Sequence, residues 1–346
     1  MISELVDGRV RLVELGERVV GDDVEFVYIM RTDTSYVCDE FASRMGLAAE
    51  CMPSLVEQYE WFVVRLASLL GDAFATERPG IVIDLLDGRA IDRRRRELIP
   101  AGSVVVSLDP LMADALPLAF SRCYAMGGRD FLLMLPRPGY PTMEAQLEAI
   151  QATGADVPIT VVEDDIYTGE TLSQTMRTYL GPVHSRITTI VAGTRIGGVG
   201  LDGQPYETRA AIVYRTPQGT SAIDKIDLGD PRDYLIGASG LVVRLPDDRG
   251  LGRLPYLLPF VSTAARASIP TASEIEFARE ALALGGRFYA ALEGIAGRPV
   301  VLGDCDPHFV AAIEATMGLD ATTSIHDLIA VATDQITTLS ATFGAR

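Results

Sequence analysis

Lysine is almost absent from this chain of 346 residues, because Lys225 is the only lysine among its 30 basic residues. Acidic residues number 47, so the formal net charge is -17 at pH 7. This charge would repel nucleic acids and anionic membranes, and we expect neither as a partner. The arginines are scattered along the sequence and form no basic stripe. A small-molecule ligand is therefore the partner that the composition favours.

Cysteines and long apolar runs are also scarce. Only four cysteines occur, none in a CxxC spacing, so reduced thiols are expected. The first residues, MISELVDGRVRL, carry acids where a signal peptide needs a basic end, and no apolar run reaches membrane-spanning length. We therefore expect a cytoplasmic protein.

Apolar runs alternate with helical spacing between residues 103 and 192. This alternation predicts an α/β fold in which a mainly parallel, twisted sheet has helices on both faces. Residues 159–162 should form a central strand with 103–108 beside it, and 112–124 should form a helix. The glycine-rich stretch 193–200 is expected to be a mobile loop near the ligand.

Three regions are expected along the chain. Residues 1–95 should form an α+β extension, 96–259 an α/β core and 260–346 a helical carboxyl-terminal region. Within the first region, an apolar stripe between Leu55 and Leu69 at helical spacing predicts core packing or a subunit contact. We expect a homo-oligomer.

The most informative stretch is 159–172, which reads ITVVEDDIYTGETL. Four residues suited to a buried strand run into Glu163 and Asp164, and a turn containing Gly169 precedes renewed helical spacing. Glycine lets the main chain approach a ligand closely, and amides at a helix start can bind phosphate. Paired carboxylates at the end of a parallel strand suit sugar hydroxyls or Mg²⁺. Together they predict a site for a ribose 5-phosphate compound, although an ordinary strand-turn-helix connection can carry two acids as well.

This order of residues resembles the 5-phosphoribosyl 1-pyrophosphate (PRPP) motif of the type I phosphoribosyltransferases, most closely in the spacing of the hypoxanthine-guanine branch. The resemblance implies a transferase of nucleotide metabolism whose Glu163 and Asp164 bind the ribose hydroxyls and Mg²⁺. It also implies a loop around the 5-phosphate. The loop residues expected to contact substrate are Asp165, Thr168, Gly169, Glu170 and Thr171.

Tyr167 departs from the pattern of that branch, which has an aspartate here that handles the proton of the purine. A tyrosine, with a reference pKa of about 10, is a poor base at neutral pH. We therefore expect an acceptor that is not a 6-oxopurine. With Glu163 and Asp164, Tyr167 completes the predicted catalytic set, and its ring either packs against the acceptor or folds back against the helix.

The family places its pyrophosphate loop where this chain has residues 107–111. Such a loop needs small residues and exposed amides, but here it carries Asp109 and a proline without an N–H group. Either Asp109 holds a metal that bridges to pyrophosphate, or the loop no longer binds it. Arg137, in the stretch 136–141 where the family carries its lid, is expected to cover a phosphate.

Two classes of function follow from the interpretation of Asp109. One is a phosphoribosyltransferase-like enzyme, and the other is a non-catalytic regulator that senses PRPP or a nucleotide. A third, weaker interpretation is a phosphatase or metal site built on residues 304–308, where Asp306 as a helix cap is preferred. The arginine run 93–96 is expected to be a solvated face. The polar turn 31–35 either binds an anion or simply connects a strand to a helix.

Overall fold

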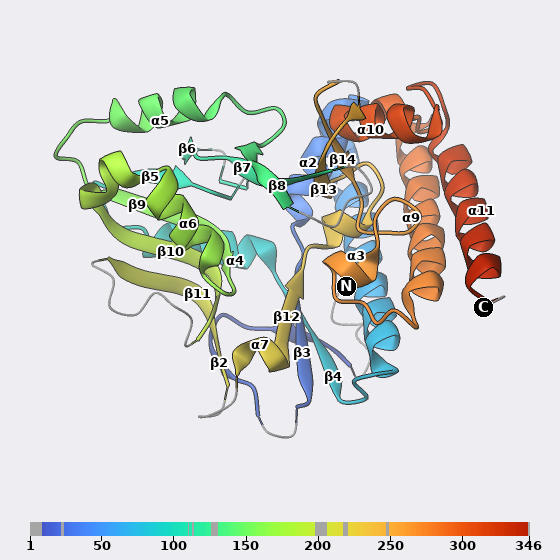
Figure 1. Ribbon diagram of the computed structural model, residues 1–346, viewed down its shortest axis with the longest axis horizontal. Helices are drawn as coiled ribbons and strands as arrows, with labels where there is room; N and C mark the ends of the chain where they lie inside the picture. Colours follow the sequence, from blue (N-terminus) through green and yellow to red (C-terminus); the bar gives the residue numbers. More distant parts are fainter. Residues whose placement is uncertain are drawn as a thin grey trace.

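The structure is a computed structural model that describes residues 9–21, 24–109, 111–112, 114–125, 131–197, 206–216, 221–246 and 249–344. Three β-sheets lie beside a group of carboxyl-terminal helices, with the strands of residues 104–215 at one side of the view and the helices after residue 270 at the other (Figure 1). The fold is therefore α/β with mostly parallel sheets.

The largest sheet has six parallel strands and contains the predicted central strand. Its order is β2 (Gly16–Val19), β11 (Glu207–Arg215), β10 (Ile187–Ile196), β9 (Ile159–Ile166), β5 (Val104–Ser107) and β6 (Leu116–Pro117). β9 pairs with β10 on one side and β5 on the other, and its residues 159–162 are fully buried. The predicted position of residues 159–162 is confirmed.

Helices cover both faces of this sheet. On one face, α5 (Met143–Gln151) and α6 (Glu170–Thr178) contribute Ile150 and Leu172 to a cluster with Val161 of β9. On the other, α4 (Gly88–Leu98) contacts β10 and β11, and a smaller cluster contains Val162 and Val191. Successive residues of a strand point to opposite faces, so two apolar faces follow from a continuously apolar strand.

A second parallel sheet consists of β1 (Val10–Val13), β4 (Ile81–Leu86), β3 (Phe26–Arg31) and β12 (Ile226–Gly229). α2 (Thr34–Met45) follows β3, and α3 (Met52–Ala75) contacts β4 and β1. The two parallel sheets exchange strands, because β2 follows β1 but pairs with β11, while β12 follows β11 but pairs with β3. The short α7 (Ala222–Lys225) precedes β12, and the 3-10 turn η3 (Pro231–Tyr234) follows it.

The third sheet has the order β14 (Leu251–Leu254), β13 (Leu241–Arg244), β7 (Phe120–Ala125) and β8 (Phe131–Pro136). The predicted helix over 112–124 is wrong, because this segment forms β6 and β7. Pro117 would interrupt a helix at that place, and the main chain of β7 is hydrogen-bonded to β8 and β13 instead. The predicted loop at 193–200 is wrong in its first part, since residues 193–196 belong to β10. Residues 198–200 lie outside the described part.

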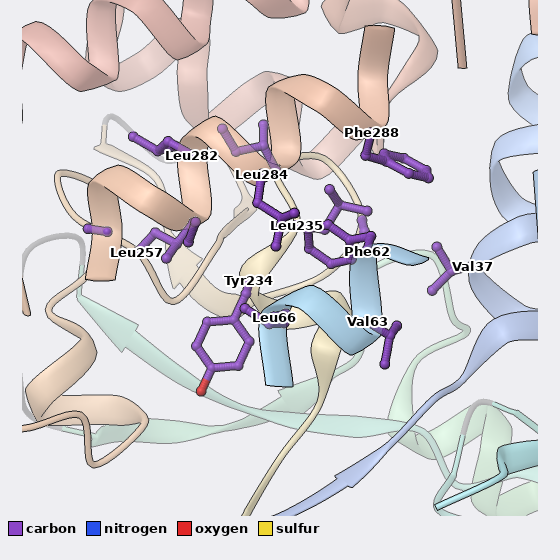
Figure 2. Packing of buried hydrophobic residues seen from close by; sticks show 14 of the residues in the cluster. Val37, Phe62, Val63, Leu66, Tyr234, Leu235, Leu257, Leu282, Leu284 and Phe288 are labelled. Atoms are coloured by element: carbon purple, nitrogen blue, oxygen red, sulfur yellow. The ribbon is translucent and has the colours of Figure 1, made fainter. Parts of the chain in front are cut away.

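The carboxyl-terminal region is helical, as predicted. After α8 (Thr263–Arg266) come α9 (Glu274–Ala296), the turn η5 (Leu302–Asp304), α10 (Pro307–Met317) and α11 (Ile325–Gly344). Figure 2 shows Phe62 of α3 and Phe288 of α9 on facing helices, with ring centroids 5.9 Å apart, and Leu66 and Leu282 belong to the same apolar cluster. The apolar stripe of α3 is thus core packing. The remaining short turns are η1 (Ala49–Cys51) and η2 (Gly181–Arg186).

No helix in the described ranges is long and apolar enough to cross a membrane.

Candidate functional site

The acids of the motif lie on β9 itself, because the strand continues to Ile166 before the chain bends. Helix α6 then begins at Glu170, with Gly169 as its N-cap at φ 70° and ψ 2°. This left-handed conformation is easily adopted only by glycine. The cap supplies no side-chain hydrogen bond to the first turn. The sequence Thr168-Gly169 therefore leaves first-turn amides of α6 without an acceptor from the N-cap side chain.

A cavity of about 660 Å³ lies at the carboxyl end of β9. All residues from Glu163 to Gly169 line it, and so does Arg137. The other walls come from β7, the segment after β12, β13 and β14. Together with the end of α8 (Thr263–Arg266), they bring four further arginines to the cavity: Arg122, Arg232, Arg253 and Arg266. Glu170 and Thr171 lie in the first turn of α6, and their side chains are not among those described.

The pKa values of Glu163 and Asp164 shift in opposite directions. Burial, together with the charge of Asp164, raises the pKa of Glu163 well above its ordinary value. Burial alone would also raise the pKa of Asp164, but the hydrogen bond with Glu163 and the charges of Arg31 and Arg232 lower it instead. A proton bound to the pair therefore lies on Glu163, and Asp164 is the more acidic of the two.

Asp165 is the third acid of the motif. Burial raises its pKa to about 6, with Arg31 opposing and the charge of Asp164 adding to the rise. A carboxyl group in this range is partly protonated near neutral pH. Asp165 pairs in register with Thr194 of the neighbouring strand β10.

Asp109 is buried at the end of β5 and does not line the cavity. Its Oδ2 lies 2.5 Å from Nη1 of Arg95 and 3.7 Å from Nη1 of Arg31, while Oδ1 accepts a hydrogen bond from the Leu111 amide. Both oxygens are thus used inside the protein. At the predicted position of a pyrophosphate loop, this structure has a buried ion pair, and Pro110 lies outside the described residues.

Arg31 and Arg95 are the important residues that sequence reasoning missed. Arg95 is fully buried, whereas Arg94 and Arg96 on either side of it are exposed, so the interpretation of 93–96 as a solvated face is wrong at this one position. A signal was present, because Arg95 lies four residues after buried Ile91 and therefore on the same face of α4.

The polar turn after β3 joins the same network of charges. Arg31 pairs with Asp33 and lies 3.8 Å from Oδ2 of Asp164. Asp33 in turn lies 2.6 Å from Arg232, which also pairs with Asp230 at 2.7 Å. This chain of alternating charges connects the ends of β3, β9 and β12, and it fixes one wall of the cavity.

Tyr167 lines the cavity with its ring and uses its hydroxyl elsewhere. The hydroxyl donates a hydrogen bond to the Ile226 carbonyl at the start of β12, 2.8 Å away. Burial, and then the charge of Asp227, raises the pKa of Tyr167 to about 12. Its hydroxyl therefore stays protonated at neutral pH.

Arg137 follows β8 and lies against β7, where it donates to the Ser121 hydroxyl at 3.4 Å and the Phe120 carbonyl at 3.5 Å. It contributes positive charge to the cavity wall opposite the motif acids.

Residues 304–308 have structural partners. Asp306 caps α10 by accepting from the amides of His308 and Phe309, as the preferred interpretation predicted. Asp304 pairs with Arg298 at 2.7 Å and accepts from the Val301 amide. Over the described ranges, no group of three or more His, Cys, Asp or Glu side chains is arranged to hold a metal ion.

No protein-family model matches this chain, and no curated protein matches it in sequence. The likeness to the phosphoribosyltransferases therefore rests on residues 159–172 and their surroundings.

Proposed function

We propose that the protein binds PRPP, or a related ribose 5-phosphate compound, with Mg²⁺ in the cavity at the end of β9. It would then transfer the phosphoribosyl group to an acceptor other than a 6-oxopurine. The observation that carries this proposal is the convergence of the motif residues 163–169 and five arginines on one cavity of about 660 Å³. This volume lies within the range of small-molecule sites.

The 5-phosphate fits the turn between β9 and α6. Gly169 brings the main chain close without a Cβ, and the first-turn amides of α6 point toward the end of the strand, as in other phosphate-binding helix starts. Thr168, which is exposed in the cavity wall, adds a hydroxyl donor. The ribose hydroxyls would then reach Glu163 and Asp164, where Asp164 accepts hydrogen bonds as a carboxylate and Glu163 donates as a carboxylic acid.

These two residues also fit Mg²⁺. The donors are all oxygen, Asp164 is ionised, and its side chain is 27% exposed toward the cavity. Mg²⁺ commonly binds through one or two carboxylates and completes its shell with water and substrate phosphates, so the single Asp164 carboxylate is sufficient, with Glu163 beside it. When bound, the ion would offset negative charge on the departing pyrophosphate. Asp109, which is occupied by Arg31 and Arg95, is not needed in this set.

The reacting ribose develops positive charge at C1 as pyrophosphate leaves. Fixing the phosphate at one end and the hydroxyls at the other holds C1 in place. Such positioning of the reacting atom lowers the activation barrier of the transfer. Arg122 and Arg137 line the β7–β8 wall of the cavity, and their charges would stabilise the departing pyrophosphate there.

The acceptor argument depends on Tyr167. Because its hydroxyl donates to the Ile226 carbonyl and keeps its proton, the residue cannot replace the aspartate that serves 6-oxopurines. Its ring packs against the apolar cluster that contains Val27 and Ile226, and the residue also lines the cavity, where an acceptor would meet its exposed part. Steady-state assays with PRPP and a panel of bases test this claim, and efficient turnover of hypoxanthine or guanine would overturn it.

One observation favours the second function, a regulator that binds PRPP without transferring it. At the position of the pyrophosphate loop, Asp109 pairs with Arg95 and Arg31, and among the described residues there the amides of Leu108, Asp109 and Leu111 already donate inside the protein. Release of pyrophosphate from bound PRPP separates the two functions, because only the enzyme would show it.

The central experiment is calorimetry with PRPP and Mg²⁺ on the double variant Glu163→Ala/Asp164→Ala. We expect at least a tenfold loss of affinity, or about 1.4 kcal/mol. The matched control is Glu57→Ala/Glu77→Ala, which removes two exposed acids from outside the cavity. Unchanged affinity in the first variant would mean that the acids only end the strand.

A further inference from the structure

Besides the first cavity, which lies at the end of β9, the protein has a second cavity of about 650 Å³. It lies where β3 and β4 end and the helices α2 and α4 begin, and residues 33–36, Gly88 and Arg89 line it. Its volume is in the range of small-molecule sites. The polar turn 31–35, which the sequence presents as an anion site or a plain connection, thus contributes to the wall of a cavity.

The two helices that begin at this cavity both have an aspartate at the N-cap, but only one of the two aspartates caps its helix. Asp87 accepts hydrogen bonds from two first-turn amides of α4. Asp33 makes no such bond, because its carboxylate pairs with Arg31 and Arg232. The first-turn amides of α2 are therefore left without an acceptor from the N-cap side chain, and they carry the positive end of the helix dipole.

The hydroxyl of Thr34 is a second, independent feature that indicates a ligand. Thr34 is the first residue of α2, lies in the cavity wall and is only 3% exposed. Within the described ranges, its hydroxyl has no hydrogen-bond partner. A hydroxyl that is buried without a partner destabilises the fold, and the cavity is the open space beside it. A ligand in the cavity would supply the missing acceptor.

Arg89 of α4 brings a positive charge to the start of α2. Its Nε donates to the Ser35 hydroxyl at 3.0 Å, which leaves the hydrogen of that hydroxyl free for a ligand. The two helix starts are close together, because a Cβ at Gly88 would lie 3.1 Å from the amide nitrogen of Asp33. Over the part of the chain that the structure describes, Arg89 pairs with no carboxylate.

The ion pairs of the cavity wall determine which charge remains available. Four of the five carboxylates that line the cavity pair with arginines, namely Asp33, Glu40, Asp92 and Asp306. The fifth, Asp39, is exposed and lies five residues after Thr34, about 7.5 Å further along α2. The unpaired charge at the start of α2 is therefore that of Arg89, which favours an anion there.

We propose that the start of α2 is a phosphate site, and that the second cavity binds the phosphate monoester of a small organic molecule there. The phosphate oxygens would accept from the first-turn amides of α2 and from the hydroxyls of Thr34 and Ser35, with Arg89 as the cation. A phosphate offers three acceptor oxygens, which suits this number of donors better than the two of a carboxylate.

The cavity is larger than a phosphate ion needs, so the phosphate belongs to a larger molecule. Tyr36 and Tyr140 line the cavity and offer their rings as packing surfaces for its organic part. This site goes beyond the function proposed above, because the described residues that line the second cavity include none of the motif 163–169.

The test is calorimetry with inorganic phosphate and with phenyl phosphate, in the presence of PRPP and Mg²⁺ to fill the first cavity. We expect saturable binding of both, with phenyl phosphate the tighter. Thr34→Val and Arg89→Gln should each lower the affinity at least about tenfold, the effect of removing a hydrogen bond to a charged group. Thr34→Ser keeps the hydroxyl and should retain the affinity.

Arg94→Gln is the matched control, because Arg94 is an exposed arginine of the same helix and is not among the described residues that line the second cavity. It should leave the affinity unchanged. Absence of phosphate binding, or equal affinity in Thr34→Val and the unmodified protein, would overturn the phosphate site. Equal affinity for the two ligands would overturn the organic monoester. Failure of PRPP to bind would contradict the proposed function alone, since the α2 and α4 variants would still test this site.

Discussion

At the scale of single residues, the pair Glu163 and Asp164 controls the charge of the first cavity. Folding partly buries both groups and moves their pKa values apart, with the pKa of Glu163 raised and that of Asp164 lowered. One carboxyl group then donates hydrogen bonds while its neighbour accepts them. A ligand with hydroxyl groups can use both capacities.

This pair predicts a pH-dependent stability. Above about pH 4.3, the unfolded chain loses the Glu163 proton that the folded protein keeps, so this residue makes the folded state progressively less stable as pH rises. Glu163→Gln keeps the hydrogen-bond donor without the titration. Its midpoint of thermal unfolding should therefore rise relative to the unmodified protein between about pH 4 and pH 7. Glu57→Gln, at an exposed position, should show no such trend. If the unfolding midpoints of Glu163→Gln and of the unmodified protein instead changed in parallel with pH, the raised pKa of Glu163 would be contradicted.

Arg95 gives a second prediction at this scale. It is buried against Asp109, so removing it leaves an uncompensated carboxylate in the interior. We expect Arg95→Leu to lower the free energy of unfolding by about 3 to 5 kcal/mol. The control is Arg94→Leu, which removes an exposed arginine paired with Glu97 and should cost less than about 1 kcal/mol. Urea denaturation measures both, and similar losses in the two variants would disprove a structural role for the buried pair.

The types of residue that the motif brings to the first cavity could be predicted from the sequence, whereas the ion pairs around them could not. The stretch 163–169 shows its chemistry locally, because acids, glycine and threonines follow one strand. Arg31, Arg95 and Arg232 reach the same place from β3, α4 and η3, and nothing in their local sequence indicates which acid each will meet. Long-range ion pairs depend on the fold.

At the scale of elements, the strand and helix that carry the motif depend on one glycine. Gly169 has φ 70°, and an alanine there would incur the cost of the left-handed conformation, about 1 to 2 kcal/mol. We expect Gly169→Ala to lower stability by that amount. It should also weaken PRPP binding, because a Cβ would stand beside the first-turn amides of α6.

Gly181→Ala is a suitable control for this element. Gly181 opens the turn η2, lacks a positive φ, and has open space where a Cβ would be added. Its substitution should be nearly neutral in thermal unfolding. An equal loss in the two variants would show that the conformation of Gly169 is not the cause.

The elements that were predicted correctly are those with a strong local pattern. Residues 159–162 are apolar without interruption, and the apolar stripe of α3 has clear helical spacing. The error at 112–124 has a physical reason, since apolar residues around Pro117 suit either structure until the strand partners β8 and β13 are known. The end of β10 was missed because Gly193 was interpreted as a loop residue. In the structure a side chain at 193 would collide with the main chain of Asp164, so glycine there allows two strands to approach.

At the scale of the whole molecule, the two parallel sheets are joined by an exchange of strands and by a buried cluster of polar groups. The cluster is centred on Asp84 of β4, which is fully buried. It pairs with Arg11 of β1 and accepts a hydrogen bond from the hydroxyl of Tyr214 in β11, 2.8 Å away. The first cavity is built from both sheets, so its shape depends on this connection. The sequence could not predict it, because the residues involved are more than 70 positions apart.

The last prediction tests this connection. In Tyr214→Phe the ring still fills its place, but the buried carboxylate of Asp84 loses a donor that comes from the other sheet. Asp84 keeps its pair with Arg11, so the variant loses one hydrogen bond to a buried charged group, which contributes about 1.5 to 3 kcal/mol, and we expect that loss in the free energy of unfolding measured with urea. The control is Tyr179→Phe, at a partly buried ring that stacks against Phe120 and has no hydroxyl bond within the described ranges. Because Tyr214 lines neither cavity, PRPP affinity in Tyr214→Phe should fall only if the contact between the sheets shapes the first cavity. A stability equal to that of the Tyr179→Phe variant would mean that the strand exchange alone holds the two sheets together.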